Sequence, residues 1–170
     1  MDTMGLIDPA ALSRWFDVYG AALVLYARQW LSTDAAEDVV QEVFVRLLSQ
    51  GRAPDHVKSW LFRSVRNAAI GRVRSQKRRC KYEGQRAADR QAWFEGRPDD
   101  LLDAAAAQSA LLALPDEQRE VIVLRIWAGM TLQEASQVTG QPVSTLFSRY
   151  RAGLAALRET METSCKTQKD

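Results

Sequence analysis

Apolar side chains recur every three or four positions along most of this chain, which is the period of amphipathic helices. The first such stretch opens with Asp8 and Pro9, a capping residue followed by a first-turn proline, and runs to about Trp30. Its apolar stripe is rich in aromatic side chains, and we expect it to be core: Leu12, Trp15, Phe16, Tyr19, Leu23, Tyr26, Ala27 and Trp30. The pattern therefore predicts a long first helix with one buried face.

A second amphipathic helix is predicted to begin at Asp34, because Asp34 and Glu37 have the spacing of a capping pair. Its predicted buried side consists of Val39, Val40, Val43, Phe44, Leu47 and Leu48. Asp38, Gln41 and Glu42 follow one another at offsets of three and four, so they share the opposite side. Such an acidic face does not attract nucleic acid, and we expect it to meet a protein partner.

A loop from Gln50 to Asp55 leads to a third predicted helix, which starts near His56 and ends in a basic run that reaches Lys81. Clear periodicity is lost over residues 83–103, where Gly, Pro, Asp and Gln accumulate as in a flexible linker. Residues 1–82 therefore form a first predicted helical domain.

The second predicted domain covers residues 104–162 and contains a helix-turn-helix. Thr131 and Glu134 have capping-box spacing, so a short helix is expected to begin there. Gly140 ends it, because glycine tolerates the left-handed conformation of a tight exit. Residues 163–170 are polar and are predicted to form a disordered tail. The predicted fold class is all-α, with two small helical domains joined by a flexible linker.

The last predicted helix carries different chemistry on its two faces. Its apolar face comprises Val143, Leu146, Tyr150, Leu154 and Leu157. Small hydroxyl side chains and arginines lie elsewhere on its first turns, at Ser144, Thr145, Ser148, Arg149 and Arg151. Residues of these types contact base edges and phosphates when a helix lies in the major groove. An ordinary helical hairpin with a solvated polar face has the same spacing.

Charge is unevenly distributed along the chain. The 170 residues are 46% apolar and 26% charged, with a formal net charge of +2, as in a folded protein. Eleven basic residues nevertheless lie between Lys58 and Arg90, opposed only by Glu83 and Asp89. A chain that segregates charge in this way can present one polyanion-binding face while it stays near neutral overall.

The third predicted helix combines cations with aromatic side chains. It carries Lys58, Trp60, Phe62, Arg63, Arg66, Asn67, Arg72 and Arg74. Cations follow phosphates, and an aromatic ring offers a stacking surface to an unpaired base, which a reader of duplex DNA does not need. A solvated basic helix with Trp60 in the core is the plainer interpretation of the same residues.

The sequence holds no catalytic or metal-binding pattern. His56 is the single histidine, and no serine or cysteine near it suggests a nucleophile pair. Asp38 and Glu42 lack the matching ligands that a metal needs, and Cys80 and Cys165 lie far apart in polar surroundings. We therefore expect a cytoplasmic protein that is not an enzyme, needs no cofactor or metal, and does not insert into a membrane.

Four segments together resemble the extracytoplasmic-function (ECF) sigma factors of the bacterial sigma-70 family. They are DAAEDVVQEVFVRL at 34–47, SWLFRSVRN at 59–67, LPDEQREV at 114–121 and the helix-turn-helix from Thr131. The resemblance covers about residues 8–82 and 101–160, and four segments in the family's order are more specific than any one of them. It implies a sigma factor that binds core RNA polymerase, recognises −35 and −10 promoter elements and promotes DNA melting.

The resemblance also assigns roles to positions in this chain. Asp38, Gln41 and Glu42 match the surface that docks on the clamp helices of the polymerase, whose flap is a second expected contact. The residues matched to −10 binding and melting are Arg52, Lys58, Trp60, Arg63, Arg66, Asn67, Arg72 and Arg74. Those matched to the −35 element are Ser144, Thr145, Phe147, Ser148, Arg149 and Arg151. An anti-sigma factor is a further expected partner, because family members are often held by one.

The chain departs from the family pattern in the last helix. Phe147 stands where many relatives carry a lysine, and Ala152, Ala155 and Ala156 replace common basic residues. An apolar contact between Phe147 and a thymine methyl could replace the lost contact.

Two alternative functions remain open at this point. A conventional helix-turn-helix regulator that does not bind core polymerase leaves the acidic face unexplained, and a helical adaptor leaves the last helix unexplained.

Overall fold

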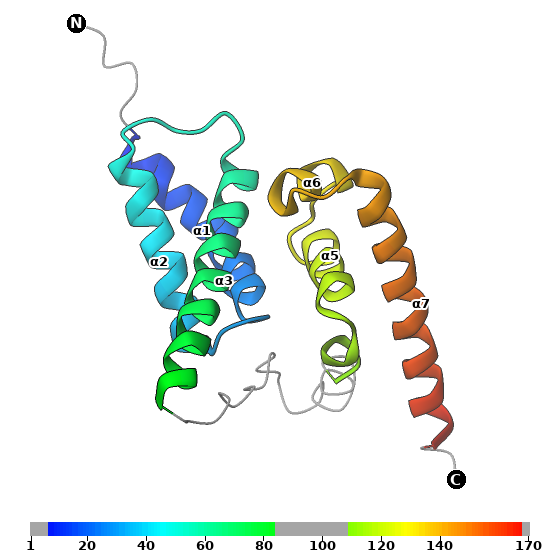
Figure 1. Ribbon diagram of the computed structural model, residues 1–170. Helices are drawn as coiled ribbons and strands as arrows, with labels where there is room; N and C mark the ends of the chain where they lie inside the picture. Colours follow the sequence, from blue (N-terminus) through cyan, green and yellow to red (C-terminus); the bar gives the residue numbers. More distant parts are fainter. Residues whose placement is uncertain (1–6, 84–108, 168–170) are drawn as a thin grey trace, which may run out of the picture. The chain divides into compact units, whose positions relative to one another are not determined.

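The structure, a computed structural model, describes residues 7–83 and 109–167, and these form helices, turns and loops without a β-strand. They divide into two compact units (Figure 1). The first holds α1 to α3, and the second holds α5, α7 and most of α6. The predicted all-α fold with a C-terminal helix-turn-helix is confirmed. All but the first residue of the predicted linker, 83–103, lies outside the described residues.

The first unit consists of three helices that all pack on one another: α1 (Pro9–Ala27), α2 (Thr33–Ser49) and α3 (Val57–Glu83) (Figure 1). Each helix contributes the apolar side of its periodic pattern to a common core. The fully buried side chains include Leu23 and Tyr26 from α1, Val39, Val43 and Leu47 from α2, and Leu61, Phe62 and Val65 from α3. Burial of these faces removes apolar surface from water and stabilises the unit.

Two helix starts differ in how they are capped. Asp8 caps α1 as predicted, since its Oδ1 accepts a hydrogen bond from the Ala10 N–H at 3.1 Å. The capping role predicted for Asp34 is wrong, because α2 already begins at Thr33 with Ser32 at the N-cap position. The Ser32 carbonyl accepts the first helical bond, from the Ala36 N–H at 2.9 Å. Asp34 instead lies in the first turn, where a negative charge complements the helix dipole.

Two side chains predicted to be core are in fact half exposed. Phe16 is 48% exposed and Leu48 is 47% exposed. The buried residues of α1 begin only at Gly20, so the apolar stripe extends past the part of the helix that its neighbours cover. Phe16 still packs edge-on against Phe44, with ring centroids 5.1 Å apart. α1 also ends at Ala27, before the predicted end, and the next three residues form a turn.

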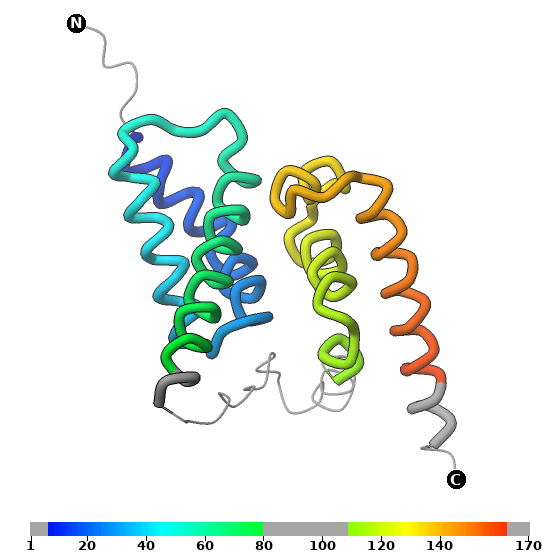
Figure 2. The backbone as a smooth tube through the Cα atoms, in the orientation of Figure 1, coloured from blue at the N-terminus to red at the C-terminus, as the bar shows by residue number. Residues whose placement is uncertain are grey.

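The second unit contains α5 (Asp116–Ile126), α6 (Leu132–Thr139) and α7 (Val143–Thr167), and residues 109–113 are also helical. Figure 2 shows the chain passing from α6 through a tight turn into α7. α7 continues to Thr167, beyond the point at which the sequence predicts a disordered tail. No glycine or proline follows Gly153 to end the helix.

Gly153 marks a close approach between α7 and α5. A Cβ atom at this position would lie 2.6 Å from Ile122 Cδ1 and 3.3 Å from Gln118 Cβ. Gly153 and Ile122 are both buried, so there is little room for either to shift. Glycine is therefore required here for contact with α5 rather than for its backbone freedom.

Candidate nucleic-acid interface and acidic docking face

α2 presents an exposed acidic face made by Asp38, Gln41 and Glu42. The structure thus brings together the three residues that the sequence grouped by their spacing. Val45 extends this surface by one turn and is 64% exposed. Its offset of seven from Asp38 is the signal that could have included it. We call these four residues the acidic face; it offers carboxylates, an amide and one apolar contact to a partner.

Arg72 of α3 lies across the acidic face. Its Nη2 donates to Glu42 Oε2 at 3.0 Å, and its Nη1 lies 3.8 Å from Asp38 Oδ2. Nη1 also donates to the Ala35 carbonyl oxygen at 3.3 Å. The sequence grouped Arg72 with the DNA-binding residues, whereas the structure turns its guanidinium toward α2. The arginine offsets the repulsion between two carboxylates that stand one helical turn apart.

Four other residues of α3 share one solvent-facing stripe. Trp60, Arg63, Asn67 and Arg74 recur at helical spacing, on the side away from the buried Leu61, Phe62 and Val65. Arg63, Asn67 and Arg74 are exposed, and Trp60 is half-buried. The Trp60 side chain is therefore partly packed against the protein and partly accessible to solvent. We call these four residues the α3 stripe. It combines two permanently charged arginines, an amide and an aromatic ring, which are the groups that suit binding to an unpaired strand of nucleic acid.

Three further predicted −10 residues, Arg52, Lys58 and Arg66, are not part of the stripe. Lys58 and Arg66 are half-buried. Arg52 is exposed in the loop between α2 and α3, next to Gly51, whose φ of 71° allows the chain to turn out of α2. Figure 1 shows this loop joining the ends of the two helices. The cations of the stripe and the loop are thus available to a polyanion from the solvent side of the unit.

The turn of the helix-turn-helix has the geometry that the sequence predicts. Thr131 Oγ1 accepts from the Glu134 N–H at 3.1 Å, and Glu134 Oε2 accepts from the Thr131 N–H at 2.7 Å, so the capping box is confirmed. Gly140 has a φ of 72°, in the left-handed region. The Ser136 hydroxyl donates to the Gln141 carbonyl oxygen at 2.7 Å. These bonds join the end of α6 to the turn and so set the direction in which α7 leaves.

α7 exposes a compact group of side chains on its first turns. Ser144, Phe147, Ser148 and Arg151 are all exposed, on the side away from the buried Leu146. We call these four residues the reading face. The guanidinium carbon of Arg151 lies 5.7 Å from the centroid of the Phe147 ring, which is 49% exposed. The structure therefore brings together four of the six residues predicted for the −35 element.

The other two predicted residues lie outside this group. Thr145 is half-buried. The Arg149 side chain is 25% exposed, and its Nη2 lies 2.7 Å from Glu117 Oε2 of α5. Arg125 makes a second link between the same helices, with its guanidinium carbon 5.7 Å from the centroid of the Tyr150 ring. Arg149 is thus held against α5 rather than presented with the reading face.

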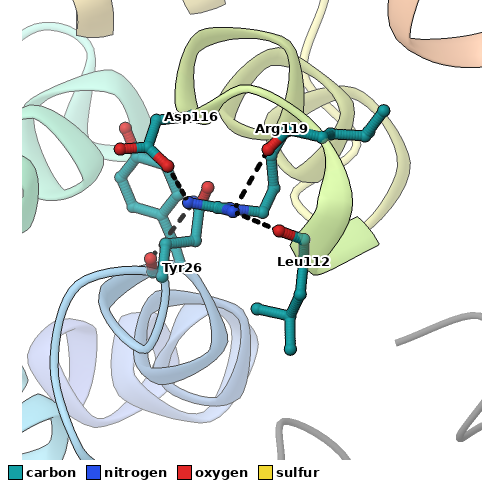
Figure 3. A network of polar contacts seen from close by, with 6 residues as sticks. Tyr26, Leu112, Asp116 and Arg119 are labelled. Atoms are coloured by element: carbon teal, nitrogen blue, oxygen red, sulfur yellow. Dashed lines mark hydrogen bonds and ion pairs between the residues drawn. The ribbon is translucent and has the colours of Figure 1, made fainter. Parts of the chain in front are cut away.

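Arg119 secures the start of α5, a role that sequence reasoning missed. Its Nη1 donates to the carbonyl oxygen of Leu112 at 3.4 Å (Figure 3). The same atom donates to the carbonyl oxygen of Leu114 at 3.4 Å. Its Nη2 pairs with Asp116 in the first turn of the same helix (Figure 3). The side chain is 3% exposed. The fork geometry of a guanidinium suits it to join a preceding chain segment to a helix start, and only the buried position of Arg119 reveals this role.

In the part of the chain that the structure describes, no helix is long and apolar enough to cross a membrane. No group of three His, Cys, Asp or Glu side chains in the described ranges 7–83 and 109–167 could hold a metal ion.

Comparison with known families matches both units. Residues 15–79 match the model described as "Sigma-70 region 2", and residues 104–157 match the one described as "Sigma-70, region 4". The chain therefore belongs to the sigma-70 family.

Individual relatives indicate which type of sigma-70 protein it is. It is 29% identical over 175 aligned positions to the ECF RNA polymerase sigma factor SigK of Mycobacterium tuberculosis, covering 92% of this chain and 89% of SigK. It is 28% identical over 169 positions to the ECF RNA polymerase sigma factor SigW of Bacillus subtilis, covering 91% of this chain and 90% of SigW.

Solved structures show the same fold. The sigma factor RpoE from Bartonella quintana, in complex with the anti-sigma factor NepR, matches with a TM-score of 0.73 at 23% identity, covering 88% of this chain and 95% of RpoE. CnrH, in complex with the cytosolic domain of CnrY, matches with a TM-score of 0.66 at 26% identity, covering 92% of this chain and 90% of CnrH. The family matches, the relatives and the fold agree: the chain is a sigma factor of the ECF type.

Proposed function

We propose that each of the three surfaces defined above, the acidic face, the α3 stripe and the reading face, binds a different target. The acidic face binds the clamp helices of core RNA polymerase. The α3 stripe, together with Arg52, Lys58 and Arg66, holds the melted −10 element. The reading face enters the major groove at the −35 element, and the second unit also contacts the polymerase flap. The chain acts in the cytoplasm and performs no catalytic step itself.

The observation that carries this proposal is the charge on the first unit. One three-helix unit exposes carboxylates on α2 and a cationic, aromatic stripe on α3. DNA is attracted to the stripe and repelled by the carboxylates, so the same unit binds DNA and a second, cationic surface without competition between them. A conventional DNA-binding regulator needs only the DNA-binding surface and has no need of the acidic one.

Strand opening follows from the chemistry of the α3 stripe. Extruding a base from the stack costs a few kcal/mol. Stacking of one base on an aromatic side chain returns about 1–3 kcal/mol. Trp60 offers such a surface, and Arg63 and Arg74 on the same stripe supply charge for the phosphates of the exposed strand. The stripe therefore favours the unpaired strand over the duplex.

Reconstitution with core RNA polymerase tests the proposal. The purified chain is mixed with core polymerase and a promoter template, and association, transcript formation and strand opening at −10 are measured separately. We expect the chain to associate with the polymerase and to confer initiation at a fixed start. Lack of association with core polymerase would overturn the proposal, and DNA binding by the chain alone would then favour a helix-turn-helix regulator.

We also propose an anti-sigma factor as a partner. Support comes from the two solved structures, in one of which RpoE is bound by the anti-sigma factor NepR. An anti-sigma factor acts by covering surfaces that the polymerase needs. A candidate protein is tested by competition: it should bind the chain and release it from core polymerase. A protein that binds without lowering polymerase binding is not an anti-sigma factor for this chain.

A further inference from the structure

Two predicted −35 side chains, Ser148 and Arg149, are already engaged within the protein. The Ser148 hydroxyl donates to the Ser144 carbonyl oxygen at 3.1 Å, which leaves Ser148 only as an acceptor. Arg149 is paired with Glu117 at 2.7 Å, and Thr145 is half-buried. Arg151 is therefore the one arginine of the predicted −35 set whose fork is not held by a carboxylate in the described residues.

Phe147 and Arg151 form a single stacked unit on the outside of α7. They stand four residues apart, on neighbouring turns of one helix face, with the guanidinium carbon 5.7 Å from the ring centroid. The ring is 49% exposed and is therefore accessible to a base in the groove. Stacking on the ring restricts the guanidinium before DNA arrives, so less conformational freedom is lost on binding.

The major groove offers one apolar group and one favoured partner for an arginine fork. The apolar group is the C5-methyl of thymine, and the partner is the O6/N7 edge of guanine. The two side chains are stacked on each other, so the groups they meet must also be neighbours. We infer that Phe147 and Arg151 together read a thymine and a guanine in adjacent base pairs of the −35 element. The inference rests on the proposed function and names the specificity determinant of that site.

The sequence preference is measured with the holoenzyme. Promoters with a randomised upstream element are selected for binding by the chain assembled with core polymerase, and the enriched element is read. We expect adjacent T·A and G·C pairs. The selected thymine is then replaced by uracil, which lacks only the methyl group and should lower binding about fourfold. Replacing the guanine by 7-deazaguanine, which lacks the N7 acceptor, should lower it roughly 5- to 150-fold.

Conservative variants separate the two contacts. Phe147→Leu keeps an apolar contact but no ring, so the uracil effect should remain while discrimination for guanine falls. Arg151→Lys keeps the charge but not the fork, so guanine discrimination should be lost with little change in salt dependence. Arg158→Ala is the matched control, since Arg158 is exposed one heptad further along α7 and should leave the base preference unchanged.

The outcomes distinguish this inference from the function on which it rests. If the holoenzyme does not form, the proposed function fails. If it forms and selects a −35 element without adjacent T·A and G·C pairs, the inference is overturned while the function stands. An equal loss for Arg151→Ala on all sequences would likewise overturn the inference, because it would make Arg151 a phosphate contact.

Discussion

The guanidinium of Arg72 in α3 lies 3.0 Å from the carboxylate of Glu42 in α2. A cation from the helix proposed to bind the −10 element therefore lies on the surface proposed to bind the polymerase. Its side chain is 38% exposed, and exposed ion pairs contribute about 0–1 kcal/mol, so its stabilisation of the fold is small. Its larger effect is to lower the negative charge that an approaching partner meets.

Removing this cation should make the acidic face more attractive to a cationic partner. We expect Arg72→Ala to raise the rate of association with core polymerase severalfold at low salt, with the gain disappearing at high salt. Stopped-flow mixing at several ionic strengths measures this. Arg74→Ala is the control: it removes the same charge from the opposite side of α3, and it should weaken promoter opening instead. Slower association of Arg72→Ala would show that the polymerase uses Arg72 directly.

Neutralising the acidic face should weaken polymerase binding without unfolding the chain. Asp38 and Glu42 have side chains that are 69% and 56% exposed, so Asp38→Asn combined with Glu42→Gln leaves the core untouched. We expect a loss of about tenfold in affinity for core polymerase and an unchanged circular dichroism spectrum. Glu37→Gln, exposed on another side of α2, should bind normally. Equal losses in both proteins would mean that only the overall charge matters.

Trp60 should act on strand opening rather than on duplex binding. Trp60→Ala removes the stacking surface and should reduce opening at −10 by roughly 5- to 150-fold, the value of one stacked base. A fluorescent base analogue in the −10 element reports the opening. Trp60→Phe should retain most of the activity, and a template already unpaired at −10 should reduce the defect of Trp60→Ala. Normal strand opening by Trp60→Ala would mean that Trp60 serves only in packing and does not stack on a base.

The pair between Arg149 and Glu117 should act on the fold of the second unit. A double-mutant cycle with Arg149→Ala and Glu117→Ala should give a coupling of about 0.2–1 kcal/mol in the free energy of unfolding. Promoter binding should fall modestly and without a change in the preferred −35 bases. If Arg149→Ala instead relaxed the preference at one base pair, Arg149 would be a reader that leaves Glu117 when DNA binds.

Two helical glycines should respond oppositely to the same substitution. Gly153→Ala forces a methyl group against Ile122 and should destabilise the second unit by about 1–3 kcal/mol. Gly71→Ala, in α3, meets nothing within 4 Å and should stabilise the first unit by about 0.5–1 kcal/mol. Thermal unfolding of both variants measures the difference. Stabilisation by Gly153→Ala would mean that α5 and α7 can separate without cost.

Local patterns predicted the existence of the helices and the turn of the helix-turn-helix, although not every helix end. The capping box at Thr131 and the left-handed Gly140 depend on residues within one turn of each other, so their chemistry can be read directly from the chain. The same holds for the acidic face, because Asp38, Gln41 and Glu42 share a side of any helix that contains them. Four of the six predicted −35 residues share an exposed face for the same reason.

Helical periodicity did not predict the direction of side chains at the edges of those faces. Arg72 and Arg149 lie at positions where a long side chain can turn toward solvent or toward a neighbouring helix. Their partners Glu42 and Glu117 are about thirty residues away along the chain, and only packing brings these pairs within 3.0 Å and 2.7 Å. The exposure of Phe16 likewise depends on where neighbouring helices stop covering α1. Short-range periodicity thus accounts for the elements and their faces, whereas long-range contacts between helices select which charged groups remain available to DNA and polymerase.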